Sequence, residues 1–281
     1  MPPKATSGQL LFALILGLLV AFVPGLFYTL RNYSEAQVER ANGLYQFIPG
    51  VRSKDLGVST TTDWHGYEAQ IVSRDPSIIY IKNFLSSSEA SHFIRISEGK
   101  YQPSPLYRGD DVLIDQTRRL SEFVEVERDD VVKQVERRAR RFQGWRGKST
   151  QLQRPRVQKY KEGGFLDYHY DWDPLVDDGN RVTTFMIYLS DNCTGGETNF
   201  SRVKKLEDPR WCSSILDCNS TYPGITFRPV AGSAVFWENM YPNGSFHDKV
   251  IHAALPVRSG EKIGLNLWFW DSGWKKPAGE A

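Results

Sequence analysis

Downstream of Trp145 the chain breaks into eight short runs of β-forming residues, and this pattern limits the fold more than any other feature. Glycine, proline and asparagine separate the runs, as is usual where turns join short strands. The runs cover residues 156–160, 166–172, 182–190, 197–200, 226–228, 233–237, 249–253 and 261–270. An earlier run of the same kind lies at 78–81.

Two helices are predicted before these strands. Residues 86–89 read Ser-Ser-Ser-Glu and provide capping chemistry for a helix over 90–96. Residues 129–143 carry apolar side chains at helical spacing and predict a second, supporting helix. Helices followed by many short strands predict an α+β protein, namely a jelly roll of two sheets with a helical buttress on its N-terminal side.

The N-terminus carries a long apolar segment. Residues 9–30 contain no charged side chain and are long enough to span a bilayer. A cleaved signal peptide normally has an apolar region of only about 7–15 residues, so we expect an uncleaved transmembrane signal-anchor. The expected organisation is a short cytoplasmic tail at 1–8, the anchor at 9–30, a polar stem at 31–75, the folded domain at 76–272 and a C-terminal tail at 273–281.

Five Asn-x-Ser/Thr sequons follow the apolar segment. They begin at Asn32, Asn192, Asn199, Asn219 and Asn243. Basic residues stand on both sides of the segment, so the positive-inside rule says little about its orientation. Because such sequons are glycan acceptors in the secretory pathway, we expect a single-pass type II protein of the endoplasmic reticulum membrane with a lumenal domain.

The chain has three cysteines, which is an odd number. Cys212 and Cys218 flank a short polar loop and can form a disulfide in an oxidising compartment, which would leave Cys193 free. Three reduced thiols are the alternative, since sequence alone does not decide the pairing.

The overall charge gives no reason to expect a nucleic-acid partner. The formal net charge is +2, and the one basic cluster, residues 137–141, is preceded by acidic residues. We interpret this cluster as a solvated helix face.

Residues 165–172, Phe-Leu-Asp-Tyr-His-Tyr-Asp-Trp, place polar and aromatic side chains in alternation. On a strand, His169 and Asp171 share one face with Asp167 and Asp173, and the aromatic side chains lie on the other. Two nitrogens and one carboxylate are the ligand set of a mononuclear non-haem Fe(II) site. His252, in another short β-like run, would supply the second nitrogen.

The last predicted strand puts a lysine on an otherwise apolar element. Residues 263, 265, 267 and 269 form its core face, whereas Lys262 shares the opposite face with Trp268 and Trp270. A buried ammonium is costly unless an anion pairs with it. A dicarboxylate cosubstrate would supply that anion through a charge-assisted hydrogen bond.

Each of these assignments has a rival. His247 competes with His252 but follows Asn-Gly-Ser-Phe in an expected loop, and Asp173 competes with Asp171 but precedes a proline at the strand end. Arg258 competes with Lys262 but stands beside Ser-Gly in an expected turn.

These residues belong to a series of motifs that resembles the prolyl 4-hydroxylase family of 2-oxoglutarate/Fe(II) dioxygenases. The motifs are Tyr160-Lys-Glu-Gly-Gly with His169-Tyr-Asp171, Thr-Thr-Phe-Met-Ile-Tyr-Leu at 183–189, Gly-Gly-Glu-Thr at 195–198, the segment 229–237, His252-Ala-Ala-Leu-Pro-Val, and Lys262 with Trp268. They occur in order and cover about residues 76–270.

The resemblance implies a double-stranded β-helix that binds iron through His169, Asp171 and His252. It implies that Lys262 binds the distal carboxylate of 2-oxoglutarate with help from Tyr160 and Thr198, and that Trp268 lines the same pocket. The implied cofactors are Fe(II), 2-oxoglutarate, O2 and ascorbate. Two features depart from the family pattern: Leu166 replaces a frequent aromatic residue, and segment 201–225 is long.

The implied reaction is hydroxylation of peptidyl proline at C4, with conversion of 2-oxoglutarate to succinate and CO2. The implied partners are a proline-containing peptide or protein and, through the N-terminal helix, a membrane. The alternatives are a dioxygenase of the same family that acts on another residue or a small molecule, and a non-catalytic jelly-roll module that binds a glycan or a peptide. Segments 102–114 and 173–180 are expected to form lids over the peptide groove.

Overall fold

The computed structural model describes residues 66–276 except 109–110, 145, 177 and 213. The expected anchor at 9–30 and residues 31–65 of the expected stem lie outside the described residues, whereas Glu68–Arg74, also expected in the stem, form a strand of the larger sheet. Within the described part, no helix has both the length and the apolar character that a membrane crossing requires.

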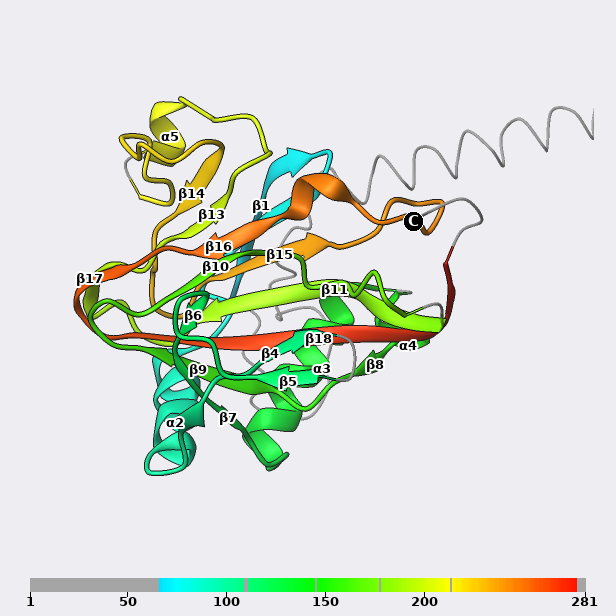
Figure 1. The fold of residues 1–281 in the computed structure, drawn as a ribbon, viewed down its shortest axis with the longest axis horizontal. Helices are drawn as coiled ribbons and strands as arrows, with labels where there is room; N and C mark the ends of the chain where they lie inside the picture. Colours follow the sequence, from blue (N-terminus) through cyan, green and yellow to red (C-terminus); the bar gives the residue numbers. More distant parts are fainter. Residues whose placement is uncertain (1–65, 109–110, 145, 177, 213, 277–281) are drawn as a thin grey trace, which may run out of the picture. The chain divides into compact units, whose positions relative to one another are not determined.

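Two antiparallel sheets form the body of the protein (Figure 1). The larger runs β1 (Glu68–Arg74), β2 (Ser77–Lys82), β15 (Ala234–Glu238), β11 (Asp178–Tyr188), β18 (Lys262–Lys275), β9 (Arg156–Tyr160), β7 (Glu122–Glu125), β3 (Gln102–Pro103), with β8 (Gln151–Leu152) also paired to β18. The smaller runs β14 (Ile225–Phe227), β13 (Thr198–Phe200), β16 (His252–Ala254), β10 (Phe165–His169), β6 (Arg119–Leu120).

Two short two-stranded sheets complete the strands of the described part. β12 (Cys193–Gly195) pairs with β17 (Val257–Gly260), and β4 (Leu106–Arg108) pairs with β5 (Asp111–Leu113). All eight strand runs expected after Trp145 are therefore present, with ends that differ by a few residues. The jelly-roll expectation is confirmed, whereas the short strands β3 to β8 had no signal in the sequence.

Both predicted helices are present on one face of the larger sheet. α2 (Ser87–Ser97) begins after a complete capping box between Ser86 and Glu89, and α3 (Asp130–Phe142) begins after Asp129, whose side chain accepts from the Val132 amide. α4 (Arg146–Ser149), α5 (Pro209–Cys212) and the 3₁₀ turn η1 (Asp248–Val250) are short.

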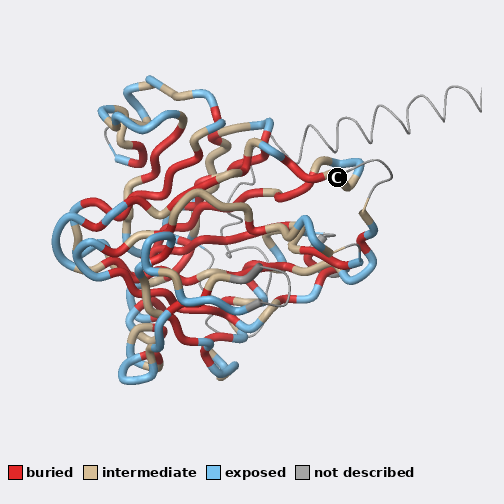
Figure 2. The backbone as a smooth tube through the Cα atoms, viewed as in Figure 1, coloured by how far each residue is buried: buried red, intermediate tan, exposed pale blue. Residues whose placement is uncertain are grey.

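The hydrophobic core has two parts, one on each side of the larger sheet. The first packs the helices against the sheet and contains Phe93, Val132, Val135, Ala139, Phe185, Ile187, Leu265, Leu267 and Phe269. The second lies between the two sheets and contains Tyr80, Tyr188, Phe200, Phe227, Val235 and Trp237. The molecule is thus built as helices, large sheet and small sheet, with buried strands and exposed connections (Figure 2).

One arginine of the basic cluster is buried, which corrects the expectation of a wholly solvated helix face. Arg137 and Arg141 are exposed, but Arg138 is only 1% exposed. Its guanidinium binds both carboxylate oxygens of Glu89, at 2.7 and 3.0 Å, and donates to the Phe84 carbonyl. The ion pair joins α2 to α3.

The cysteine expectation is confirmed. Cys212 and Cys218 form a disulfide that closes the end of the long segment between β13 and β14, and Cys193 is a free, half-buried thiol.

Candidate active site

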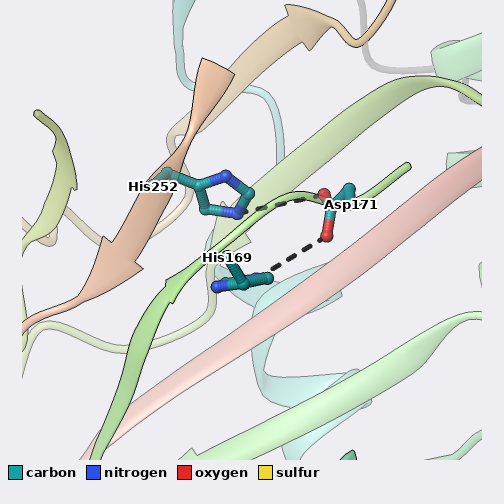
Figure 3. Close-up of side chains that lie close together, drawn as sticks. All are labelled: His169, Asp171 and His252. Atoms are coloured by element: carbon teal, nitrogen blue, oxygen red, sulfur yellow. Dashed lines mark ion pairs between the residues drawn. The ribbon is translucent and has the colours of Figure 1, made fainter. Parts of the chain in front are cut away.

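Two side chains from adjoining strands of the smaller sheet and a third from the bend that follows one of them converge on one point (Figure 3). His169 on β10 lies directly opposite His252 on β16, and their rings are 4.3 Å apart. Asp171 completes the cluster: its Oδ1 is 3.8 Å from His169 Nε2 and its Oδ2 is 4.0 Å from His252 Nε2. One ligand atom from each of the three residues lies within 4.8 Å of the others.

Asp171 reaches the cluster in a way that strand alternation did not predict. β10 was expected to continue to residue 172 but ends at His169, and Asp171 stands in a bend. Arg181 steadies this bend by donating from Nη1 to the Asp171 carbonyl oxygen at 3.2 Å. His169 and Asp171 therefore lie together as expected, but the bend after β10 brings them together and not the alternation of a strand.

Both histidines hold the tautomer that a metal ligand needs. His169 Nδ1 lies 2.9 Å from the carbonyl oxygen of Asp167, and His252 Nδ1 lies 2.9 Å from that of Val250. Because a carbonyl can only accept, each Nδ1 carries the proton and each Nε2 directs its lone pair at the cluster.

The electrostatics of the cluster favour neutral imidazole and ionised carboxylate. Burial and the neighbouring His252 lower the pKa of His169 far below its ordinary value. Burial alone would raise the pKa of Asp171, but His252, His169 and Arg181 outweigh it and hold that pKa below the ordinary value. Ionised Asp171 is the form that binds cations.

This donor set fits a divalent metal ion. Asp171 is 5% exposed and His252 6%, while the His169 side chain is partly open to the solvent, so two lone pairs and a carboxylate face one another in a largely buried space. Such an arrangement is unfavourable without a cation between the groups. Two imidazole nitrogens and one carboxylate, with remaining positions open, match Fe(II).

A small cavity leads from the two histidines to Lys262. It is lined by Tyr160, Leu166, Met186, Thr198 and Trp237, among others. The Lys262 side chain is only 2% exposed, and no acceptor in the described part of the chain pairs with its ammonium. Burial lowers the pKa of Lys262 to about 8. A buried ammonium at the end of a cavity is suited to binding an anion.

Two tyrosine rings, those of Tyr160 and Tyr188, flank that ammonium. Lys262 and Tyr160 are partners across β18 and β9, and Lys262 Nζ lies 5.4 Å from the centre of the Tyr160 ring. The Tyr160 hydroxyl donates to Gln158 Oε1. Thr198 also lines the cavity and accepts from the Tyr188 hydroxyl at 2.9 Å.

Tyr188 is a site residue that the sequence reasoning missed. Its ring centre lies 5.5 Å from Lys262 Nζ. Its hydroxyl donates to the Thr198 hydroxyl and so fixes that side chain. A signal was present: on the strand predicted over 182–190, Tyr188 shares a face with Thr184 and Met186.

A larger cavity of about 370 Å³ adjoins the metal cluster from another side. His169 and Asp171 line it, together with Pro105 and Leu106 at the start of β4 and with Asp173, Pro174 and Leu175 from the loop before β11. Parts of both segments that were expected to form lids therefore line this cavity.

Trp268 lines this larger cavity and not the one that contains Lys262. Its ring is flanked by Arg181 at 4.4 Å and Arg156 at 5.5 Å. This placement differs from the expectation that Trp268 shares the pocket of Lys262. Trp268 stands six residues beyond Lys262 on β18, which is roughly 20 Å along an extended strand and beyond the reach of the ammonium.

None of the three rival residues lies in the metal cluster. His247 binds Asp75 at 2.9 Å, and the Asp173 carboxylate accepts from the Leu175 amide. Arg258 is largely exposed and pairs with Glu197 at 3.2 Å.

Comparison with known proteins places these features in a family. Residues 155–270 match the model of the 2OG-Fe(II) oxygenase superfamily. Probable prolyl 4-hydroxylase 6 of Arabidopsis thaliana is 30% identical over 208 residues, which cover 69% of this chain and 68% of that protein. Probable prolyl 4-hydroxylase 7 of the same plant is 29% identical over 207 residues, covering 69% of this chain and 62% of that protein, so the match spans less than two thirds of its length.

A solved structure shares the fold. The viral collagen prolyl hydroxylase from Paramecium Bursaria Chlorella virus-1, crystallised as its 2OG complex, superimposes with a TM-score of 0.52 at 24% identity and covers 69% of this chain and 95% of that one. The His-Asp-His cluster, the superfamily match and the plant relatives agree. The chain belongs to the prolyl 4-hydroxylase family of the 2OG-Fe(II) oxygenases.

Proposed function

We propose that this oxygenase hydroxylates peptidyl proline at C4. One observation supports the proposal most strongly: the buried ammonium of Lys262, which has no acceptor among the residues that the structure describes, stands in the same small cavity as His169 and His252. A cosubstrate with two carboxylates can bind the metal at one end and the ammonium at the other. The names of the plant relatives supply proline as the substrate.

Different residues of the site would bind the metal and the cosubstrate. His169, His252 and Asp171 would hold Fe(II), and Lys262 with Thr198 would bind the distal carboxylate of 2-oxoglutarate. When bound, iron, 2-oxoglutarate and O2 supply the oxidising chemistry, with succinate and CO2 as products and ascorbate keeping the iron reduced. Leu166, Met186 and Trp237 make the walls of the small cavity apolar and exclude water from it.

The larger cavity is the proposed site of the substrate. It opens beside His169 and Asp171, and Leu106, Leu175 and Trp268 give it apolar walls. A pyrrolidine ring held there would stand next to the metal ligands, and backbone carbonyls of a peptide would find the guanidinium of Arg181 nearby.

Release of succinate from 2-oxoglutarate, measured with and without a proline-rich peptide, tests the proposal. We expect the peptide to stimulate release and to gain the mass of one oxygen atom on proline. Stimulated release without any oxygen on proline would contradict proline as the substrate. No succinate in either reaction would contradict the oxygenase site itself.

A second substrate class has one specific observation in its favour. Leu166 lines both cavities where relatives often carry an aromatic residue. The wall of the cavity at this position is therefore aliphatic and not aromatic. The alternative function is that of a dioxygenase of the same family that acts on another residue or a small molecule. Mass spectrometry of products from peptides with and without proline separates the two.

We also propose that residues 9–30 anchor the protein in the endoplasmic reticulum membrane with the described domain in the lumen. The apolar segment, the five sequons and the Cys212–Cys218 disulfide support this. Asn192, Asn219 and Asn243 are exposed, whereas Asn199 is fully buried and its amide is hydrogen-bonded on both sides.

Glycan mapping in eukaryotic cells tests the location. Lumenal protein should carry glycans on the exposed asparagines and none on Asn199, and should remain in membranes washed with alkaline carbonate. An unglycosylated protein that the wash releases would contradict both parts of the proposal.

A further inference from the structure

A chain of buried hydrogen bonds ends on the carboxylate of the metal cluster. The Thr184 hydroxyl donates to Asp171 Oδ2 at 2.7 Å and accepts from Asn239 Nδ2 at 3.0 Å. Asn239 Oδ1 in turn accepts from the Trp237 indole N–H at 2.8 Å. Thr184 and Asn239 are fully buried, and Trp237 is 1% exposed.

The two ends of this chain set the direction of every bond in it. An indole N–H can only donate, so Asn239 must turn its oxygen to Trp237 and its amide nitrogen to Thr184. Thr184 Oγ therefore accepts from Asn239, and its own proton is left for Asp171. An ionised carboxylate can only accept, so the last bond has the same direction.

The backbone holds the members of the chain in place. Thr184 and Trp237 are partners across β11 and β15. The Asn239 amide donates to the Val182 carbonyl at 2.9 Å, and its carbonyl accepts from the His247 amide at 3.0 Å. These contacts leave the Asn239 side chain little freedom to turn away.

The same tryptophan touches a second member of the metal cluster. The Trp237 ring meets the His252 ring edge to face, with centres 4.7 Å apart. Trp237 therefore contacts one ligand with its ring and reaches another through its N–H.

From these contacts we infer that Trp237, Asn239 and Thr184 are positioning residues for the metal. By holding Asp171 Oδ2, the relay of these three residues leaves Oδ1 as the oxygen offered to the ion and sets the carboxylate plane. Asp171 needs this support because it stands in a bend after β10 and not in the strand. The inference rests on the proposed iron-binding role of Asp171 and does not depend on the identity of the substrate.

The full chain with Thr184→Val tests the inference, because valine keeps the shape of threonine and lacks its hydroxyl. Removing a hydrogen bond to a metal ligand typically weakens metal affinity by about 10- to 100-fold. We expect a loss of that size in anaerobic Fe(II) affinity and a changed visible spectrum of the Co(II)-substituted protein. The KM for 2-oxoglutarate should change little, since Lys262 is untouched.

Thr183→Val is the matched control. Thr183 is the neighbouring residue on β11, is equally buried, and donates its hydroxyl proton to Gln143 Oε1 at 2.5 Å, away from the cluster. We expect it to lose stability as Thr184→Val does but to keep wild-type Fe(II) affinity. Thr184→Ser should restore affinity, because serine keeps the donor.

Trp237→Phe is the second variant and is used if Thr184→Val does not fold. It keeps a ring against His252 and removes the donor that orients Asn239, so it should also weaken Fe(II) binding. Wild-type Fe(II) affinity and an unchanged Co(II) spectrum in a folded Thr184→Val or Trp237→Phe protein would overturn the inference. Failure of the wild-type protein to bind Fe(II) would instead contradict the proposed function.

Discussion

Lys262 shows at the scale of one residue how stability and function oppose each other. Its ammonium is 2% exposed and has no acceptor in the described part of the chain, an arrangement that costs free energy in the unliganded protein. A carboxylate ligand would accept hydrogen bonds from this ammonium and so offset that cost. Function therefore explains a residue that packing alone would reject.

Replacing Lys262 with methionine separates the two effects. Methionine keeps the length of the stem and removes the charge, so the protein should become more stable towards urea while its KM for 2-oxoglutarate rises on the order of 10- to 100-fold. Lys262→Arg keeps a charge and serves as the comparison. A Lys262→Met protein with an unchanged KM would contradict the role of Lys262.

Binding of 2-oxoglutarate should weaken as the pH rises above 8. The pKa of Lys262 falls from 10.5 to about 8 because the side chain is buried, so the cosubstrate-free protein loses the charge that the carboxylate needs. Above pH 8 binding must recover a proton, and the apparent Kd should rise by up to about tenfold per pH unit. Titration calorimetry from pH 7 to 9.5 measures this, and Lys262→Arg should show a flat profile.

The same shift has the opposite sign for stability. Between pH 8 and 10.5 the unfolded chain holds a proton on Lys262 that the folded chain has released. Stability contributed by this group therefore rises with pH across that window. A wild-type protein whose 2-oxoglutarate affinity stays constant to pH 9.5 would count against this assignment.

At the scale of the element, the two faces of β18 have different roles: one packs in the hydrophobic core and the other lines the site. Ile263, Leu265 and Leu267 pack towards the helices, while Lys262 and Asn266 line the cavities. A shift of one residue in the pairing of β18 with β9 would exchange the two sets, which couples site assembly to core packing.

The Glu89–Arg138 ion pair joins α2 to α3. Breaking it should lower the free energy of unfolding. Arg138→Met leaves the Glu89 carboxylate buried without its cation, for which about 3–5 kcal/mol of destabilisation is typical. Urea unfolding measures this, with activity per folded molecule unchanged.

Arg137→Met is the control for that measurement. Arg137 precedes Arg138 on α3 but is exposed, so its loss should change stability by less than about 0.5 kcal/mol. Equal stabilities of the two variants would show that the buried pair contributes nothing.

At the scale of the whole molecule, the site joins the two sheets. β10 and β16 of the small sheet carry the metal cluster, and β18 and β11 of the large sheet carry Lys262, Tyr188 and Thr184. Ligands that bind across this interface bind only the folded protein, so they should stabilise the fold as a whole.

Mn(II) together with 2-oxoglutarate should therefore raise the unfolding temperature. At 100 times the Kd the gain is about 2.7 kcal/mol, which corresponds to roughly 5–10 °C for a domain of this size. Excess chelator should reverse the shift. A His169→Ala protein should show almost no shift, and a shift equal to wild type in that variant would contradict the metal assignment.

The sequence by itself determined the features that are written locally. Turn residues between short β-forming runs predicted the jelly roll, and the Ser86 capping box predicted the start of a helix. The spacing of His169 and Asp171, and the alternation that isolates Lys262 on β18, predicted most of the site. In each case the signal lies within a few consecutive residues, and on β18 the alternation of the strand alone decides which side chains share a face.

Only the tertiary structure decided what stands opposite each face. It placed Asp171 in a bend, set the Tyr188 ring beside Lys262, placed Trp268 in the neighbouring cavity and buried Arg138 against Glu89. Each of these depends on contacts between segments far apart in the chain. Periodicity specifies the direction of a side chain from its own strand or helix, but the partner it meets is set by how the sheets and helices pack.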